Sequence, residues 1–339
     1  MAKIQLEQVA RSLVAPGKGI LAADESSGTI EKRLKSISTP STEDNRRAYR
    51  EMLFRTEGAE QFVSGVILYD ETIRQKAADG TPLVKVLADK GILPGIKVDA
   101  GTKALPGSPQ EKITEGLDKL GERLVEYRGF GAKFAKWRAV ITIGDEIPTD
   151  CCLDTNAHAL ARYAALCVEA GIVPIVEPEV LMDGPHTIER CYEVTERTLH
   201  KVFAELFAQR VPLEKILLKP NMVLSGTECR TQANVTQVAE ATLHCFRRVV
   251  PAAVPGVVFL SGGQSDELAT AHLSKMNELG GGPWELSFSY GRALQAPALK
   301  AWGGKPENVA AGQKAYYHRA KLNSAARYGK YTAAMEKAA

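Results

Sequence analysis

The chain has 339 residues, 45% of them hydrophobic, which is enough to bury one large core or to form two domains. Lysine and arginine number 43 against 40 acidic residues, and the formal net charge is +3. Because acids and bases are mixed without a long basic run, neither nucleic acid nor a membrane surface is the expected partner. Residues 1–7 lack an apolar signal core, and no segment reaches the roughly 18 apolar residues of a membrane span. We therefore expect a soluble, cytoplasmic protein.

Cysteine and histidine are scattered along the chain. The six cysteines show no C-x-x-C spacing, so we predict reduced thiols and neither a disulfide framework nor a structural zinc. Cys167 falls in an apolar helical segment, where a small core residue is expected. None of the six histidines stands in an H-x-H, H-x-D or H-E-x-x-H arrangement. The sequence therefore predicts no metal and no other cofactor.

Short β-rich runs recur along the whole chain, and each is followed by a longer stretch of helical character. In chain order, the predicted strands are Gly19–Ala23, Val63–Leu68, Leu93–Val98, Ala132–Trp137, Val173–Glu177, Ile216–Lys219, Val257–Leu260 and Leu286–Tyr290. Their spacing of very roughly 30 to 45 residues suits a strand, a crossover helix and two loops, the repeating unit of a (β/α)8 barrel. We find no dividing linker, so residues 1–339 are predicted to form one α/β domain, a TIM barrel, with a short tail from about residue 328.

Two intervening segments have a clear helical pattern. A helix is predicted over residues 44–53, with a polar start and a charged outer face. Between the fifth and sixth strands, five apolar residues recur at helical spacing and are expected to pack on the sheet: Leu199, Val202, Phe203, Leu206 and Phe207.

The strand Ile216–Lys219 carries a lysine and is broken at once by Pro220. Burial disfavours a charged ammonium, so such a lysine is either ion-paired or has a pKa low enough for a neutral amine. A neutral amine attacks ketones and aldehydes, and Schiff-base formation is the main chemistry that specifically requires lysine. The alternative is a lysine that only extends its ammonium into solvent.

Ionisable groups stand at the ends of most predicted strands, which together form the active-site face of a barrel. They are Asp24, Lys97, Lys136 with Arg138, Glu177 with Glu179, Lys219, and Arg292. Buried charges are costly unless they are paired, so function explains such a set better than stability does. We expect Lys136 to help lower the pKa of Lys219, and the apolar neighbours of Glu177 to raise its pKa toward an acid/base role. Asp24 is a second acid/base, a partner for Lys136, or the N-cap of the next helix.

Two turns are candidates for binding phosphate. Residues 260–265 place a Gly-Gly pair between a strand and a helix start, where backbone N–H groups can approach an anion. Gly291 and Arg292 follow the eighth strand, beside the usual phosphate site of such barrels. Residues 26–29, with Arg33 a turn later, form a second candidate. A Gly-Gly turn by itself is more often a helix start without a ligand, but Arg292 strengthens the prediction.

Six segments carry a resemblance to a known family: residues 16–26, 134–138, 175–179, 217–222, 259–265 and 288–295. They resemble class I fructose-bisphosphate aldolase, and the match runs from about residue 14 to about residue 331. The resemblance implies a metal-free lyase (EC 4.1.2.13) with a (β/α)8 fold, usually a homotetramer. Through a lysine Schiff base it would cleave fructose 1,6-bisphosphate reversibly to dihydroxyacetone phosphate and glyceraldehyde 3-phosphate, in glycolysis and gluconeogenesis.

The resemblance also implies a role for each matching residue. Lys219 would form the Schiff base, Glu177 would be the acid/base for carbinolamine steps, and Glu179 would support them. Asp24 and Lys136 would assist at the carbon where the bond breaks. The phosphate next to the ketone would be held by Ser261, Gly262, Gly263, Ser289, Gly291 and Arg292. The distal phosphate end would be served by Ser26, Thr29, Arg33, Lys97 and Arg138; the family often has serine where this chain has Thr29.

The carboxy-terminal residues depart from part of the family. Eukaryotic members end in a mobile tail whose final tyrosine is implicated in proton transfer at the enamine. This chain ends in alanine and resembles the abbreviated bacterial members. The group that protonates the enamine stays open, with Tyr328, Tyr331, a barrel residue or water as candidates.

Three other hypotheses compete with this one. A metal-dependent aldolase would need histidine ligands that the chain does not arrange. A transaldolase-type enzyme would share the Schiff base but would not need two phosphate sites. A scaffold role would use exposed surface, and the presence of both Lys219 and Glu177 argues against a loss of catalysis.

Overall fold

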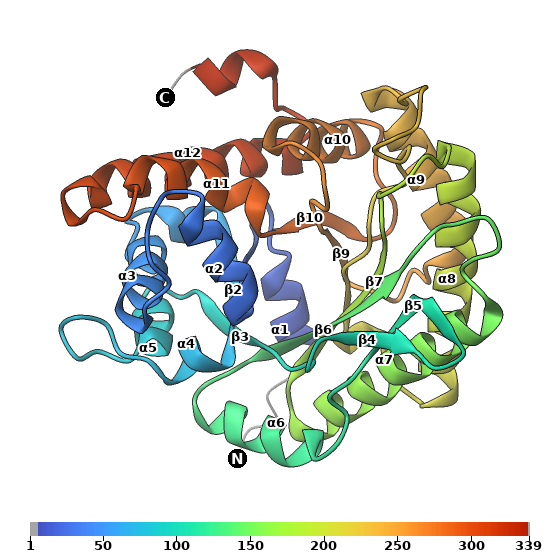
Figure 1. Cartoon of the computed structure of the whole chain (residues 1–339), viewed down its shortest axis with the longest axis horizontal. Helices are drawn as coiled ribbons and strands as arrows, with labels where there is room; N and C mark the ends of the chain where they lie inside the picture. Colours follow the sequence, from blue (N-terminus) through green and yellow to red (C-terminus); the bar gives the residue numbers. More distant parts are fainter. Residues whose placement is uncertain (1–5, 338–339) are drawn as a thin grey trace.

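The computed structural model describes residues 6–337 and contains a closed barrel of parallel strands surrounded by helices (Figure 1). Around the barrel the strands follow the order β1-β10-β9-β8-β7-β6-β3-β2. Their bounds are β1 Gly19–Ala23, β2 Val63–Leu68, β3 Leu93–Lys97, β6 Phe134–Ile141, β7 Val173–Val180, β8 Leu217–Leu218, β9 Gly256–Phe259 and β10 Glu285–Tyr290. A separate antiparallel hairpin consists of β4 Thr102–Leu105 and β5 Ser108–Thr114.

Helices connect the strands and form the outer layer. The α-helices are α1 Leu6–Leu13, α2 Ser27–Lys35, α3 Glu43–Phe54, α4 Asp70–Arg74, α5 Leu83–Asp89, α6 Leu120–Gly129, α7 Asp150–Ala170, α8 Ile188–Ala208, α9 Val235–Val249, α10 Asp266–Glu278, α11 Arg292–Trp302 and α12 Val309–Arg327. The 3-10 helices are η1 Ala59–Gln61, η2 Leu213–Lys215, η3 Pro306–Asn308 and η4 Ala333–Lys337. Among residues 6–337, every helix is too short or too polar to span a lipid bilayer.

The predicted barrel is confirmed, with differences in the lengths of its strands. All eight predicted runs occur in it, but β6 and β7 continue to Ile141 and Val180. Arg138 and Glu179 therefore lie within paired strands, where Arg138 is in register with Glu177. The β4–β5 hairpin was not predicted, because its largely exposed, polar residues lack the apolar run of a barrel strand.

The helical stripe needs one correction. Leu199, Val202, Phe203 and Leu206 are buried on α8 as predicted, whereas Phe207 is 84% exposed. With 3.6 residues per turn, Phe207 lies about 80° around the helix from Leu199, in the last turn of α8 and at the edge of the buried face.

An apolar plug closes the amino-terminal end of the barrel. The ring of Phe134 lies in the interior, and a Cβ added to Gly95 would come within 2.3 Å of it, so this strand position has no room for a side chain. The short helix α1 covers the same end, where Leu13 approaches within 2.7 Å of the Cβ position of Gly65. Figure 1 shows α1 within the ring of outer helices. Because this end is filled, a ligand can enter the barrel only at the carboxyl ends of the strands.

The cysteines are consistent with the prediction of unpaired thiols. All six are free, and Cys167 is buried in α7 as expected of a small core residue. Burial raises the pKa of the Cys167 thiol, so it remains protonated and unreactive at neutral pH.

The carboxy-terminal segment 328–337 packs on the outside of the molecule, beside α10 and α12 (Figure 1). The backbone N–H of Tyr331 donates to the Ser274 hydroxyl at 3.2 Å, and the Tyr331 hydroxyl donates to Glu336 at 2.7 Å. Glu336 also accepts two hydrogen bonds from Arg319 of α12, at 2.5 and 2.7 Å. Tyr328 packs against Gly17, two residues before β1. Its hydroxyl oxygen lies 2.7 Å from the position that a Cβ atom on Gly17 would occupy. Neither tyrosine is placed at the carboxyl ends of the strands.

Candidate active site

A cavity of about 720 Å³ opens where the carboxyl ends of the barrel strands meet. All the site residues predicted from the sequence line it: Asp24, Ser26, Thr29, Arg33, Lys97, Lys136, Arg138, Glu177, Glu179, Lys219, Ser261, Gly262, Gly263, Ser289, Gly291 and Arg292. They come from strands or loops spread over most of the chain, so barrel closure brings them together. The cavity also contains Glu25 and Asp99, which sequence analysis missed.

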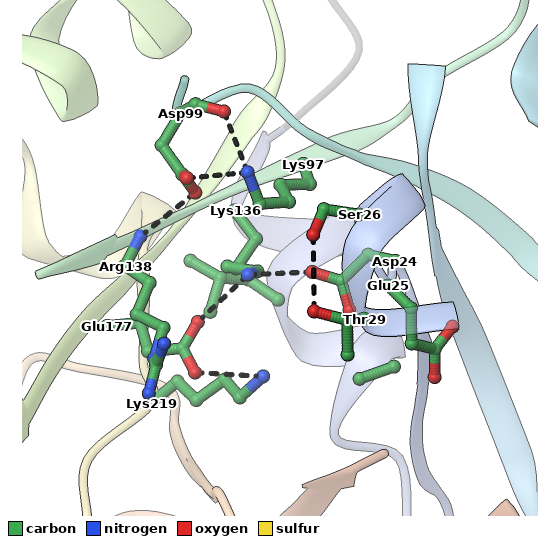
Figure 2. Close-up of polar contacts among 12 residues, drawn as sticks. Asp24, Glu25, Ser26, Thr29, Lys97, Asp99, Lys136, Arg138, Glu177 and Lys219 are labelled. Carbon is green, nitrogen blue, oxygen red and sulfur yellow. Dashed lines mark hydrogen bonds and ion pairs between the residues drawn. The ribbon is translucent and has the colours of Figure 1, made fainter. Parts of the chain in front are cut away.

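Four groups of alternating charge, three of them buried and Asp24 partly buried, form a continuous chain across the cavity floor (Figure 2). The Lys219 ammonium lies 3.1 Å from Oε1 of Glu177, and Oε2 of the same carboxylate lies 3.3 Å from the Lys136 ammonium. Lys136 in turn is 2.7 Å from Oδ2 of Asp24. Glu177 Oε2 is buried and accepts no hydrogen bond from residues 6–337, so its contact with Lys136 is an ion pair only.

The pair Lys136–Asp24 is held in its charged form. Burial alone would lower the pKa of Lys136, but the negative charges of Asp24 and Glu177 outweigh it and hold this pKa above its ordinary value. Burial alone would likewise raise the pKa of Asp24, but Lys136 and Lys219 hold it below its usual range. Asp24 is therefore a partner for Lys136. It is not the N-cap of α2, because Ser26 occupies that position.

Near β3 and β6 the cavity is lined by basic side chains that pair with carboxylates. The ammonium of Lys97, at the end of β3, donates to the carboxylate of Asp99 at 2.6 Å and to the backbone carbonyl of Asp99 at 2.7 Å (Figure 2). Arg138 pairs with Glu179 on the neighbouring strand. Asp99 follows β3 by two residues, so the rule that selected charged residues at strand ends could also have found it.

Arg33 is fixed by a buried network behind the cavity. Its guanidinium pairs with Glu25, and Arg50 of α3 donates to the Glu25 carbonyl at 2.9 Å. Arg50 belongs to the helix for which a charged outer face was predicted, but its own side chain is 0% exposed. Nη2 of Arg33 lies 3.7 Å from the Cβ position of Gly291, because β1 and β10 are neighbours. Arg33 thus stands between the turn 26–29 and the end of β10.

The other side of the cavity has the features of an anion site. The turn Ser261–Gln264 precedes α10, and Arg292 begins α11, so two helix N-termini approach it. Nη2 of Arg292 donates to the carbonyls of Gly262 and Gln264 at 3.1 and 2.6 Å. The buried hydroxyl of Ser289 has no hydrogen-bond partner in the part of the chain that the structure describes. A phosphate could occupy this position between the hydroxyl, the backbone N–H groups and the guanidinium.

Within residues 6–337, no group of three or more His, Cys, Asp or Glu side chains is arranged to hold a metal ion. The positive charge at the centre of the cavity comes from the lysines. A parallel barrel with a buried lysine–carboxylate chain in the cavity at the carboxyl ends of its strands has the features of a lysine-dependent enzyme of the (β/α)8 class.

Known proteins identify the family. A family model described as glycolytic, class-I fructose-bisphosphate aldolase matches residues 5–339. A probable class 1 fructose-bisphosphate aldolase of Xanthomonas campestris is 57% identical over 328 residues, covering 96% of this chain and 98% of the relative. Cytosolic fructose-bisphosphate aldolase 4 of Arabidopsis thaliana is 55% identical, covering 93% and 81%.

A solved structure agrees in both fold and sequence. The Plasmodium falciparum aldolase, crystallised in complex with TRAP and a small-molecule inhibitor, superposes with a TM-score of 0.95 at 51% identity and covers 96% of this chain and 95% of its own. The chain belongs to the class I fructose-bisphosphate aldolases, lyases of EC 4.1.2.13, as the resemblance implied. The metal-dependent and transaldolase-type hypotheses are therefore not supported.

Proposed function

We propose that Lys219 forms the Schiff base with the substrate ketone in this aldolase and that Glu177 moves the protons of that step. The observation that carries the proposal is the 3.1 Å contact between the Lys219 ammonium and Glu177 at the floor of the cavity. A buried amine with a carboxylate beside it can transfer a proton to the carboxylate and attack the ketone carbon. The carbinolamine hydroxyl then takes a proton from Glu177 and leaves as water, which gives the iminium.

Lys136 and Asp24 are proposed to act at the bond that breaks. The distal hydroxyl gives its proton to Glu177, which the loss of water has left as a carboxylate beside Lys136. The carbon–carbon bonding electrons then flow into the iminium, so that the aldehyde leaves and an enamine remains on Lys219. The Lys136 ammonium, kept charged by Asp24, stabilises the oxygen that becomes the aldehyde. Glu179, paired with Arg138, supports the adjacent strand and holds that guanidinium in place.

Two phosphate sites are proposed at opposite parts of the cavity. Ser261, Gly262, Gly263, Ser289, Gly291 and Arg292 would hold the phosphate next to the ketone. Ser26, Thr29, Lys97 and Arg138 would hold the distal one, and Arg33 lies close enough to Gly291 to contact either. Charge-assisted hydrogen bonds at both ends would fix the substrate so that its ketone meets Lys219.

Mass spectrometry after reductive trapping tests the assignment. Borohydride added with dihydroxyacetone phosphate should reduce the iminium to a stable secondary amine, and peptide mapping should place the adduct on Lys219. An adduct on Lys136 or Lys97 instead would overturn the proposed nucleophile without affecting the family assignment.

Arg292 is expected to contribute to binding at the ketone-side phosphate. A charge-assisted hydrogen bond contributes about 1.5–3 kcal/mol, so Arg292→Ala should raise the KM for fructose 1,6-bisphosphate by roughly ten-fold or more. Steady-state kinetics measure this KM directly. Arg292→Lys keeps the positive charge but loses the planar guanidinium, so its KM should lie between those of the parent and of Arg292→Ala. An unchanged KM in the alanine variant would contradict the site.

The carboxy-terminal segment is expected to matter more for stability than for turnover. Deleting residues 332–339 removes Glu336 and leaves the guanidinium of Arg319, which is 3% exposed, without its carboxylate. We expect a loss of about 1.5–3 kcal/mol in unfolding free energy, with turnover changed by less than about ten-fold. Urea unfolding and cleavage assays check both, and Glu336→Gln in the full chain isolates the ion pair. A collapse of turnover with a stable fold would show that this segment takes part in catalysis.

The assembly and location are also proposals. The resemblance supports a homotetramer, and the Arabidopsis relative is named as cytosolic, which supports a cytoplasmic location for this chain. Light scattering should give four times the chain mass of 36.7 kDa.

A further inference from the structure

We propose that His272, on α10 and outside the cavity, is a positioning residue for the ketone-side phosphate. It acts through Gln264, whose side chain fixes the turn Ser261–Gln264 and whose backbone holds Arg292. The inference rests on the proposed function, because that turn and Arg292 are the proposed phosphate site. Neither His272 nor Gln264 lines the cavity, so the effect of His272 on substrate is indirect.

The direction of the hydrogen bonds follows from the acceptor at one end. Nε2 of Gln264 lies 3.0 Å from the Ser261 carbonyl oxygen, which can only accept, so the amide nitrogen must face it. Oε1 of Gln264 then faces Nδ1 of His272 at 2.6 Å. Since Oε1 can only accept, His272 must carry its proton on Nδ1 and donate it. The two hydrogen bonds therefore run in one direction only, from His272 to Gln264 and from Gln264 to Ser261.

The link is buried and uncharged. His272 and Gln264 are each 4% exposed. Burial lowers the pKa of His272 to about 4, so the imidazole is neutral at physiological pH and has one proton to place. The bond to Gln264 decides the tautomer, and no charge near the phosphate depends on it.

Gln264 connects this link to both parts of the proposed phosphate site. Its backbone N–H donates to the Ser261 carbonyl at 3.2 Å, so that carbonyl receives two donors from one residue. Its own carbonyl accepts from Arg292 at 2.6 Å. A rotation of Gln264 would move the Ser261 carbonyl and the anchor of Arg292 together.

The turn needs such an anchor because glycine imposes little conformational preference of its own on the backbone. It contains two consecutive glycines, and Gly262 has a φ of +55°, in the left-handed region. The N–H of Gly263 points at the Met182 sulfur at 3.1 Å, a weak acceptor that an anion can replace. Binding through backbone N–H groups is strongest when those groups are already fixed in position. Removing the His272 donor leaves Gln264 Oε1 buried without a partner, which favours its rotation.

Two substitutions of His272 separate the hydrogen bond from the packing. His272→Leu keeps a large apolar side chain and removes the donor, whereas Nδ2 in His272→Asn takes the place of Nδ1. We expect His272→Leu to raise the KM for fructose 1,6-bisphosphate by roughly five-fold or more, with kcat within about two-fold of the parent. His272→Asn should restore the KM to within about two-fold. Gln264→Leu should match His272→Leu, and the double variant should be no worse than either single one, because both act on one link.

Reductive trapping with two ketones distinguishes positioning from a general structural role. In His272→Leu, the half-saturating concentration of dihydroxyacetone phosphate for the Lys219 adduct should rise, while that of phosphate-free dihydroxyacetone should not. Equal changes for both ketones, or no change for either, would overturn the proposal. It would also be overturned if His272→Asn had the melting temperature of the parent protein but did not restore the KM. If His272→Leu does not fold, Gln264→Leu supplies the same comparison. Failure of the phosphate site itself would appear separately, as an unchanged KM in Arg292→Ala.

Discussion

Lys219→Ala is expected to abolish cleavage of fructose 1,6-bisphosphate, with turnover lowered by at least about 10,000-fold, or about 5.4 kcal/mol of barrier. The reason is that cleavage needs an electron acceptor at the ketone carbon, and the iminium on Lys219 supplies it. Glu177 remains in place but has no amine beside it to activate. Stopped or coupled assays of aldehyde release measure the loss.

The controls for Lys219 test the chemistry and the fold separately. Lys219→Met preserves the length and removes the amine, and Lys219→Arg preserves the positive charge beside Glu177 but cannot become a neutral nucleophile. Both should be as inactive as the alanine variant and form no borohydride adduct. Circular dichroism should show a folded barrel in all three, and cleavage above one-tenth of the parent rate in any of them would refute the nucleophile.

Lys136→Met is expected to lower turnover by roughly 100- to 1,000-fold, since it removes the cation proposed to stabilise the developing oxygen charge. Schiff-base formation should be affected less, because Lys219 and Glu177 keep their 3.1 Å contact. Trapping with dihydroxyacetone phosphate should therefore still label Lys219. Loss of trapping in step with the loss of cleavage would show that Lys136 acts before the bond breaks.

The same variant should change how stability depends on pH. In the parent protein, Lys136 holds the pKa of Asp24 below its usual range, so the pair contributes stability above about pH 3.9 and loses it as the pH falls. Without Lys136, the pKa of Asp24 rises, because burial is then opposed only by the more distant charges of Lys219 and Lys97. Relative to the parent, the variant loses stability as the pH rises through the range in which Asp24 ionises, because the ionised carboxylate lacks its nearest cation. The difference in melting temperature from the parent should be larger at pH 7.5 than at pH 5.

A second substitution tests whether Lys136 only neutralises Asp24. Lys136→Met combined with Asp24→Asn removes both charges, and we expect it to recover much of the lost stability at neutral pH. Its turnover should stay as low as that of the single variant, because the ammonium itself is required. Recovery of cleavage in the double variant would reduce Lys136 to a structural counter-charge.

Local sequence pattern was sufficient to predict the barrel strands and most residues of the cavity. A strand buried on both faces needs a short apolar run, and each of the eight runs is visible within a few residues. Lys219 and Glu177 stood out because each interrupts such a run with a charge. The order of strands in a parallel barrel then places both at the same edge without further information.

Only the tertiary structure decided which charges meet. Glu177 lies between Lys219 and Lys136, and Asp24 pairs with Lys136 across the barrel, contacts that depend on register and side-chain direction between strands far apart in the sequence. Arg50 has the composition of a surface residue but is buried against Glu25, because α3 packs with that face inward.

The supporting contacts were equally absent from the sequence pattern. The hydrogen bond from His272 to Gln264 joins a helix to the turn before it, and no periodicity marks the pair. The hydrogen bond from Arg319 to Glu336 depends on where the carboxy-terminal segment folds back onto α12. Hydrophobic periodicity reports burial, which is a local property of each element, whereas a hydrogen bond or ion pair requires two particular groups within about 3 Å, a distance set only when the elements pack.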